Sequence, residues 1–213
     1  MRLAYVTAHY PPDFTSGATL QVERLARRAA DLGHHVEVFS GAIALGLADG
    51  EVHTETRDGV VVHWLGTADR VDQDVDGNWD NPVAAGAAQR WLRRFDPEVV
   101  HVHTLQTLGV GVVDAALAAG HRVIVTMHDL WWWCSRLFLV DRALQPCPIV
   151  TDVDTCACAG SVAWRADRAR RLRRTLARVD EILTPSAVLR DLVIANGVAP
   201  ERVMVDANDV AVD

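Results

Sequence analysis

A histidine followed by an aspartate, His128–Asp129, interrupts an otherwise apolar run in the middle of this chain of 213 residues. The run reads RVIVTMHDLWWWC over Arg122–Cys134, which is typical of a buried strand followed by a polar turn and a tryptophan-rich element. Ligands of parallel α/β sheets bind at the carboxyl ends of the strands. His128 therefore stands where a side chain could take part in chemistry.

A second pair of histidines, His101 and His103, lies in DPEVVHVHT, the predicted strand Asp96–Thr104. Side chains alternate along a strand, so residues two positions apart lie on the same face of the sheet. Two histidines at this spacing suit a metal site, but they also suit a polar sheet edge beside a cleft. We favour the sheet edge.

All four cysteines of the chain fall within one irregular segment, Trp132–Gly160. They are Cys134, Cys147, Cys156 and Cys158. Four thiols suit a structural zinc site, although the spacing C-x12-C-x8-C-x-C lacks the usual C-x2-C pairs. Disulfides and incidental thiols remain alternatives, and a reducing compartment disfavours disulfides. A metal ion or a bridge would explain how so long a loop stays ordered.

The elements that must position these residues alternate between strand and helix. The predicted strands are Leu3–Ala8, Val36–Phe39, Glu51–Glu55, Val60–Leu65, Asp96–Thr104, Val123–Met127, Asp180–Thr184 and a short one within Pro200–Val205. The predicted helices are a helix from Ala18 that ends at Gly33, Pro82–Phe95, Leu105–Ala119, Ala163–Arg178 and Ala187–Asn196. A hairpin turn is expected at Asp58–Gly59. The pattern predicts an α/β fold: a doubly wound, mostly parallel, Rossmann-like sheet with helices on both faces, forming a three-layer sandwich.

Composition and missing motifs exclude several classes of function. The net charge of −7 argues against nucleic acid as a partner. There is no G-x-G-x-x-G after the first strand and no P-loop. The acidic segment Thr67–Asn81 has no glycine and glutamate at the positions that a calcium loop requires, and it is interpreted as a surface loop. No apolar run reaches the ~18 residues of a membrane span. We expect a cytoplasmic protein because no signal peptide precedes the first strand.

The predicted helix Ala163–Arg178 carries seven arginines and one aspartate. The simplest interpretation is a solvated basic face. The sharper interpretation is that Arg165–Arg178 contacts an anionic membrane surface or a polyphosphate, which would place the protein peripherally at the inner face of the membrane.

Four stretches, taken together and in this order, resemble the retaining glycosyltransferases of family 4, which have two Rossmann-like domains (the GT-B type). They are YPPDFTSGATLQVERLARRAADLGHHVEVFSG, DPEVVHVHT, VIVTMHDLWWWC and ILTPSAVLRDLVIANGVAPERVMV. The resemblance covers nearly the whole chain. It implies transfer of a sugar from a nucleotide-sugar donor to a glycan, lipid-linked or small-molecule acceptor, with retention of configuration and no metal required for catalysis.

The resemblance also implies roles for individual residues. Ser16 and Gly17 match the glycine loop whose backbone approaches the donor diphosphate. His128 matches the histidine near the transferred sugar, where it would bind a sugar hydroxyl or assist the leaving phosphate. His103, Asp129 and Trp131 are expected to line the acceptor cleft.

The resemblance implies that residues 1–213 form a single acceptor-binding domain. The family's hinge motif, Asn-Gly-Val-Asp, falls where this chain reads Asn208–Asp209–Val210, four residues before its end. We therefore expect the donor domain, with its paired glutamates, to be absent and the isolated chain to be inactive. The alternative is a non-catalytic binding or regulatory subunit of a split or partnered glycosyltransferase.

Overall fold

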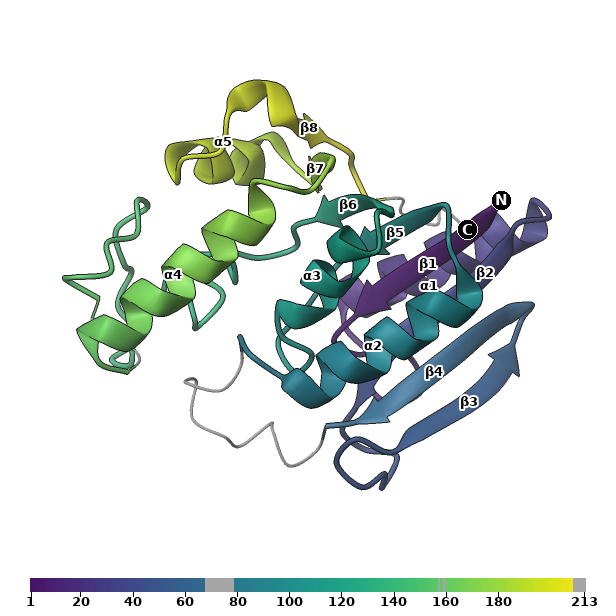
Figure 1. The fold of residues 1–213 in the computed structure, drawn as a ribbon. Helices are drawn as coiled ribbons and strands as arrows, with labels where there is room; N and C mark the ends of the chain where they lie inside the picture. The colour runs from purple at the N-terminus through teal and green to yellow at the C-terminus, as the bar shows by residue number, and fades with distance from the viewer. Residues whose placement is uncertain (68–78, 157, 159, 209–213) are drawn as a thin grey trace.

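The computed structural model describes residues 1–67, 79–156, 158 and 160–208 (Figure 1). Its strands are β1 (Arg2–Thr7), β2 (His35–Ala42), β3 (Val52–Arg57), β4 (Val60–Gly66), β5 (Val99–Val102), β6 (Arg122–Thr126), β7 (Glu181–Thr184) and β8 (Val203–Val205). Its helices are α1 (Gly17–Asp31), α2 (Pro82–Phe95), α3 (Gly111–Ala118), α4 (Val162–Leu176), α5 (Ala187–Ala195) and the 3-10 helix η3 (Pro200–Arg202).

The eight strands form one sheet in the order β3-β4-β2-β1-β5-β6-β7-β8. All pairings are parallel except that of β3 with β4, which form the antiparallel hairpin expected at the Asp58–Gly59 turn. Both turn residues have positive φ, 48° and 76°, as such a turn requires. The mostly parallel sheet confirms the predicted fold class.

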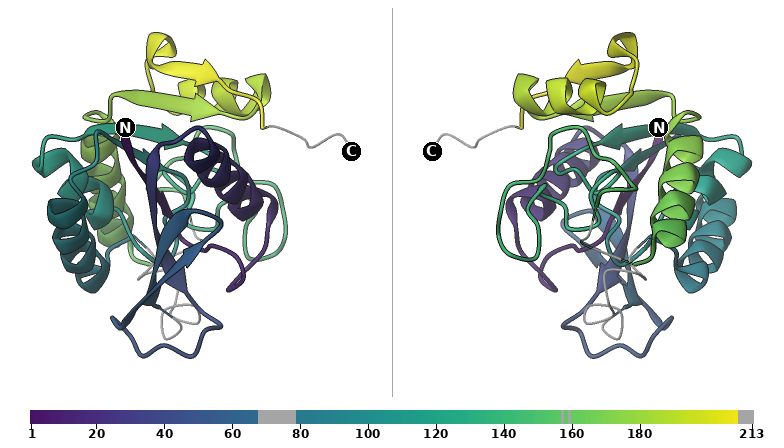
Figure 2. Two further views of the ribbon diagram at one scale, coloured as in Figure 1. Left: turned by 90° about the vertical axis from the view of Figure 1, so that its right-hand side faces the viewer. Right: turned by 90° about the vertical axis from the view of Figure 1, so that its left-hand side faces the viewer.

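Helices cover both faces of the sheet, so the molecule has three layers (Figure 2). The helix α1 lies on one face, and α2, α3 and α4 lie on the other. Two apolar clusters fill the spaces between these layers. The larger one joins β5, β6 and the helices α2, α3 and α4, and it includes Trp91, Leu108 and Leu172. The smaller one lies under α1 and includes Val22 and Trp64.

The helix predicted over Leu105–Ala119 is wrong in its first turn and a half, because α3 begins only at Gly111. The cause is Gly109, whose φ of +70° is left-handed and cannot continue a right-handed helix. A Cβ there would stand 2.8 Å from the amide nitrogen of Asn81, so the backbones pass closely at this point. The acidic segment Thr67–Asn81 falls mostly on residues 68–78, outside the described part of the chain.

The order of the strands identifies where a ligand would bind. From β1 the chain crosses through α1 to β2 on one side, while β5 pairs with β1 on the other. The strand order therefore reverses between β1 and β5. In open α/β sheets, ligands bind outside the carboxyl ends of the strands at such a reversal.

Candidate functional site

Two candidate histidines lie in direct contact at the carboxyl edge of the sheet. His103 follows β5 and His128 follows β6, and these strands are neighbours in register. His103 Nδ1 and His128 Nε2 are 2.9 Å apart, a hydrogen bond whose direction depends on the tautomers. His101 shares the same face, as predicted: its ring lies 4.3 Å from that of His103, and its Nε2 is 2.7 Å from the hydroxyl of Thr126.

Burial keeps these three histidines neutral near pH 7. The pKa of His101 and that of His128 are each lowered to about 4 by burial, and the pKa of His101 is lowered further by the charge of His128. The pKa of His103 falls well below its ordinary value because the ring is buried between the other two. The site therefore offers neutral imidazoles, which donate at one ring nitrogen and accept at the other.

Asp129 is held in place by its neighbours. Its carboxylate accepts the backbone N–H of Trp131 at 2.8 Å and the side-chain amide of Gln106 at 2.9 Å. Burial raises the pKa of Asp129, while these two hydrogen bonds and the charge of Arg168 oppose the rise. The aspartate is thus oriented by the protein rather than free to swing.

Hydroxyl groups connect the carboxyl ends of β1 and β5, where the strand order reverses. Thr7 and Thr104 bond through their side-chain oxygens at 2.9 Å, and the N–H of Ala8 donates to Thr104 at 3.0 Å. The hydroxyl of Thr107 reaches the carbonyl of Ala8 at 3.3 Å. Gly41 of β2 lies against the same point, where a Cβ would approach Ala8 O and Thr107 Oγ1 to 2.6 Å. The floor of the site is therefore rigid.

Ser16 and Gly17 form the start of α1. Ser16 is the N-cap, and it forms a capping box with Thr19, which donates its N–H to the serine hydroxyl at 3.3 Å. The first turn of a helix leaves backbone N–H groups that no helical carbonyl accepts. Gly17 is exposed, and a Cβ at this position would meet nothing within 4 Å. Space for a ligand therefore lies open beside the helix terminus.

Sequence reasoning did not single out His9 and Asp13, which follow β1. His9 is half-buried, its Nδ1 has no hydrogen-bond partner among the described residues, and burial lowers its pKa. The Asp13 carboxylate accepts the backbone N–H groups of Ile43, Ala44 and Leu45 at 2.7–3.0 Å and so fixes the loop after β2. The signal that could have found both is HYPPD, a polar cluster directly after the first strand.

Trp131 is expected to line the acceptor cleft, and the structure packs its side chain inside the described domain. Its side chain is only 2% exposed and belongs to the larger apolar cluster. The guanidinium of Arg168 lies over the ring, 5.2 Å from its centroid. Trp131 is a packing residue whose backbone, rather than its ring, supports Asp129.

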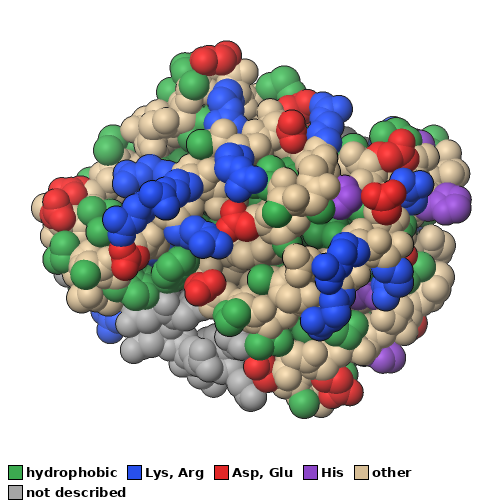
Figure 3. Space-filling model, in the orientation of Figure 1, with side chains coloured by type: hydrophobic (Ala, Val, Ile, Leu, Met, Phe, Trp, Pro, Cys, Tyr) green, Lys and Arg blue, Asp and Glu red, His purple; other side chains and the backbone are tan. Residues whose placement is uncertain are grey.

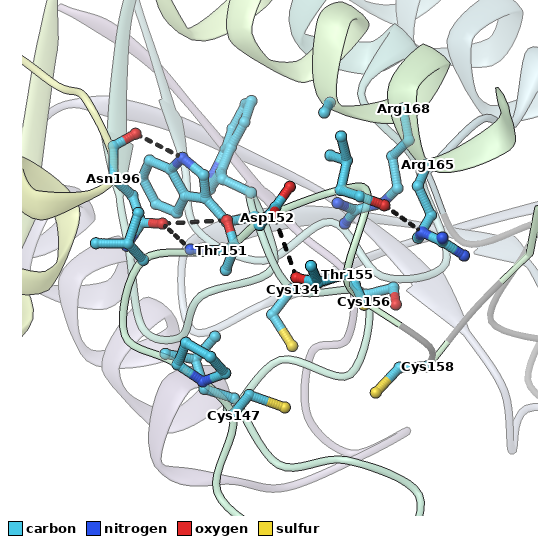
Figure 4. A pocket seen from close by; sticks show the side chains of 18 of the residues that line it. Cys134, Cys147, Thr151, Asp152, Thr155, Cys156, Cys158, Arg165, Arg168 and Asn196 are labelled. Carbon is cyan, nitrogen blue, oxygen red and sulfur yellow. Dashed lines mark hydrogen bonds between the residues drawn. The ribbon is translucent and has the colours of Figure 1, made fainter. Parts of the chain in front are cut away.

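The four cysteines gather around a separate cavity of about 520 Å³. Its wall comes from the segment between β6 and α4, from α4 itself and from the end of α5 (Figure 4). The residues that line it include the four cysteines but not His103, His128 or Asp129. All four thiols are free, and among the described residues no group of three or more His, Cys, Asp or Glu side chains is placed to hold a metal ion.

The arginine-rich helix α4 is not uniformly a solvated face. Arg168 is buried, with 3% of its surface exposed, and Arg171 pairs with Asp114 at 2.6 Å. Arg165 donates to the backbone carbonyls of Val153 and Gly160. Other arginines stay on the surface, on the face shown in Figure 3. In the described part of the chain, no helix is both long and apolar enough to cross a bilayer.

Several solved structures share this fold. They include a protein from Listeria monocytogenes assigned as a UDP-N-acetylglucosamine 2-epimerase, with TM-score 0.53, 11% identity and coverage of 95% of this chain and 44% of that chain. HepE from Anabaena in complex with UDP gives TM-score 0.52 at 14% identity, over 99% of this chain and 44% of that chain. An α,α-trehalose-phosphate synthase from Burkholderia xenovorans in complex with glucose-6-phosphate gives TM-score 0.53 at 15% identity, over 90% and 43%.

This chain thus spans less than half of the length of those proteins. No curated protein sequence matches it. The model of the glycosyl transferase 4-like domain matches residues 16–209, a range that begins at the N-cap of α1 and includes the His103–His128 pair. The chain belongs to the glycosyl transferase 4-like domain family.

Proposed function

We propose that this chain is the acceptor-binding domain of an enzyme that transfers a sugar from a nucleotide-sugar donor to a hydroxyl acceptor with retention of configuration. The observation that carries the proposal is the contact between His103 and His128 beside the strand reversal, within a chain of this family. The fold alone would not decide the chemistry, because epimerases and synthases share it.

His128 is the proposed catalytic residue. Its Nε2 is engaged with His103, so its Nδ1 is the ring nitrogen left for substrate. In the tautomer in which His103 donates, the Nδ1 of His128 carries the proton. A neutral N–H at that position can donate to a sugar hydroxyl or to the departing phosphate, and it stabilises the negative charge that develops on the phosphate. In this scheme the departing phosphate takes the proton of the acceptor hydroxyl.

Ser16 and Gly17 are proposed to receive the donor diphosphate. Backbone N–H groups at the start of α1, together with the helix dipole, favour negative charge. The absence of a side chain at Gly17 lets a phosphate approach the backbone closely. UDP-sugars are the first donors to test, because HepE was crystallised with UDP and the Burkholderia xenovorans trehalose-phosphate synthase is UDP-forming.

His103 and Asp129 are proposed to shape the acceptor side of the cleft. His103 is a positioning residue, because it is fully buried and acts through His128. Asp129 is only partly buried, and its fixed carboxylate can accept a hydrogen bond from an acceptor hydroxyl. A fixed acceptor would orient that hydroxyl toward the transferred sugar.

A peripheral contact with an anionic membrane remains a proposal for α4. Arg170, Arg173, Arg174 and Arg178 are exposed, although Arg170 pairs with Asp167. Each arginine near a membrane surface contributes about 1 kcal/mol of attraction to anionic lipid. Such a contact would suit a lipid-linked acceptor, and sedimentation with phosphatidylserine vesicles at two salt concentrations would test it.

The test of the function is sugar transfer by the complete enzyme that contains this domain. His128→Ala should lower kcat by about 10²–10³-fold, the usual cost of losing a donor to a developing charge. Proton NMR of the product should show the anomeric configuration of the donor sugar. His128→Asn serves as the matched variant, because its amide places a donor close to the position of the imidazole Nδ1 and should recover part of the rate.

Unchanged turnover in His128→Ala would contradict the catalytic role proposed for His128. A product with inverted anomeric configuration would contradict the proposed retention of configuration. The alternative, a non-catalytic subunit, has its own outcome. It predicts that the complete protein transfers no sugar by itself but raises the rate of a partner enzyme when the two are mixed.

A further inference from the structure

The segment between β6 and α4 has almost no regular secondary structure. Its described residues form no helix or strand and only an isolated bridge between Val140 and Pro146. Large apolar side chains in it face solvent instead of a core: Phe138 is 68% exposed and Leu144 is 76% exposed. Irregular segments of this length are uncommon inside a compact domain and usually serve a function.

The four cysteines of the chain come together inside this segment. All four side chains line the same cavity, although they come from separate parts of the segment. Figure 4 shows Cys134, Cys147 and Cys158 pointing into the same part of the cavity. Residues up to 24 positions apart in the sequence therefore line one cavity.

Arg168 is a buried cation that lines the same cavity and forms no ion pair with the described residues. Arg168 donates one N–H to the carbonyl of Trp131, but its Nε has no hydrogen-bond partner, and it forms no ion pair with a carboxylate of the described chain. Asp129 is the carboxylate whose charge acts on its guanidinium, without forming an ion pair with it. An unpaired buried charge is costly, so an anionic group is expected next to it.

We propose that Cys134, Cys147, Cys156 and Cys158 bind one structural zinc ion and that Arg168 is its charge partner. Four thiolates around Zn²⁺ carry a net charge of −2, which the guanidinium partly balances. Thiolate sulfurs at ~2.3 Å in a tetrahedron are the usual structural zinc ligands. The free Nε of Arg168 can donate to one of these sulfurs, as groups around a metal site commonly do. This assignment does not depend on the proposed sugar transfer.

The proposed zinc ion would lie outside the candidate site but would be connected to it by the loop from His128 to Cys134. Cys134 lies six residues after His128, and its backbone N–H donates to the carbonyl of Leu130 at 2.7 Å. The loop from His128 to Cys134 is thus anchored at its start by β6 and would be anchored at its end by the metal. The ion is structural, because the cavity lining includes neither His128 nor Asp129.

The first measurement is the metal content of the untagged protein, purified without chelator from zinc-supplemented cells. Mass spectrometry of the metal should give about one zinc per chain. Cys134→Ser and Cys156→Ser should each lose the ion, whereas the control Ser135→Ala, a change at another residue of the cavity wall, should keep it. Arg168→Met should weaken zinc binding about 10–100-fold in a chelator competition, the usual effect of removing an outer-shell partner.

The spectrum of the cobalt-substituted protein gives a second readout that does not depend on the folding of a variant. Co²⁺ bound to four thiolates should show intense sulfur-to-metal charge transfer and the visible bands of a tetrahedral site. Chelation of the wild-type protein should lower its Tm, and zinc should restore it. Purified protein that is metal-free and folded, with four titratable thiols and a Tm unchanged by zinc, would overturn the proposal. A mass lower by the hydrogens of two disulfides, in protein kept under reducing conditions, would also overturn it.

Discussion

The Nδ1 of His103 and the Nε2 of His128 lie 2.9 Å apart, and their rings are nearly parallel, with an interplanar angle of 18°. This bond joins the carboxyl ends of β5 and β6, and β5 is one of the two strands that flank the reversal in strand order. It also decides which nitrogen of His128 is available to a ligand. The partner of the catalytic candidate is thus a buried histidine rather than a carboxylate, and both rings remain uncharged.

Replacement of His103, the buried partner of His128, should weaken catalysis even though His103 does not contact the substrate. His103→Leu should lower kcat of the complete enzyme about tenfold, because one hydrogen bond contributes about 1–1.5 kcal/mol. His103→Asn, which keeps a polar atom near the position of Nδ1, should recover part of the loss. Thr126→Val is the control, since it removes the bond to His101 and leaves the His103–His128 pair intact. Equal rates for His103→Leu and wild type would contradict a positioning role.

The three histidines should also make the fold sensitive to acid. The pKa of His101 and that of His128 are about 4 in the folded chain, below the ordinary value near 6.5 of an unfolded chain. The unfolded state therefore binds protons more readily, so the stability is complete above about pH 6.5 and falls as the pH drops toward 4.

The expected size of this effect is measurable by calorimetry. One pKa unit corresponds to about 1.4 kcal/mol, and 1 kcal/mol shifts Tm by about 2–4 °C in a domain of this size. The Tm should therefore fall by about 5 °C or more between pH 7 and pH 5. A variant combining His101→Asn with His128→Asn should show a flatter profile, and a profile as steep as that of the wild type would exclude these histidines as its cause.

The sequence predicts the regular elements better than it predicts their contacts. The limits of α2 agree with the prediction at both ends, because Asn81 and Pro82 are strong start signals. The start of α3 was missed because a left-handed Gly109 looks like any other glycine in the sequence. The pattern of apolar residues reports which face is buried, but not which backbone passes close by.

Contacts between distant residues account for the remaining differences. His103 and His128 are recognisable as candidates, because each follows a strand, but their direct bond depends on β5 and β6 being neighbours. Trp131 looks like a binding residue until Arg168, 37 positions later, is seen to cover its ring. The burial of one arginine among six on α4 has no signature in a helix whose pattern is polar almost throughout.

Asp13 should be a major contributor to the stability of the N-terminal half. Its carboxylate accepts three consecutive backbone N–H groups of residues 43–45 while being only 8% exposed. Asp13→Ala leaves these donors without an acceptor and should cost about 2–4 kcal/mol in urea denaturation. Asp13→Asn should cost less, because one oxygen remains, and Asp31→Ala on the surface should change stability by less than ~0.5 kcal/mol. Hydrogen exchange of the three amides would show a local effect, and unchanged protection in Asp13→Ala would contradict this account.

A substitution at Gly17 should change the affinity for the donor without lowering the stability of the fold. No atom lies within 4 Å of a Cβ at this position, so Gly17→Ala should keep Tm or raise it slightly, since alanine favours helix over glycine by up to ~1 kcal/mol. Binding of the donor to the complete enzyme should nevertheless weaken about 10–100-fold, because the methyl group blocks charged hydrogen bonds worth about 1.5–3 kcal/mol. Gly33→Ala is the opposite control: its φ of +83° makes alanine strained there, so Tm should fall while donor affinity stays the same. Calorimetric titration with nucleotide-sugar measures both variants, and wild-type affinity in Gly17→Ala would show that the start of α1 does not receive the diphosphate.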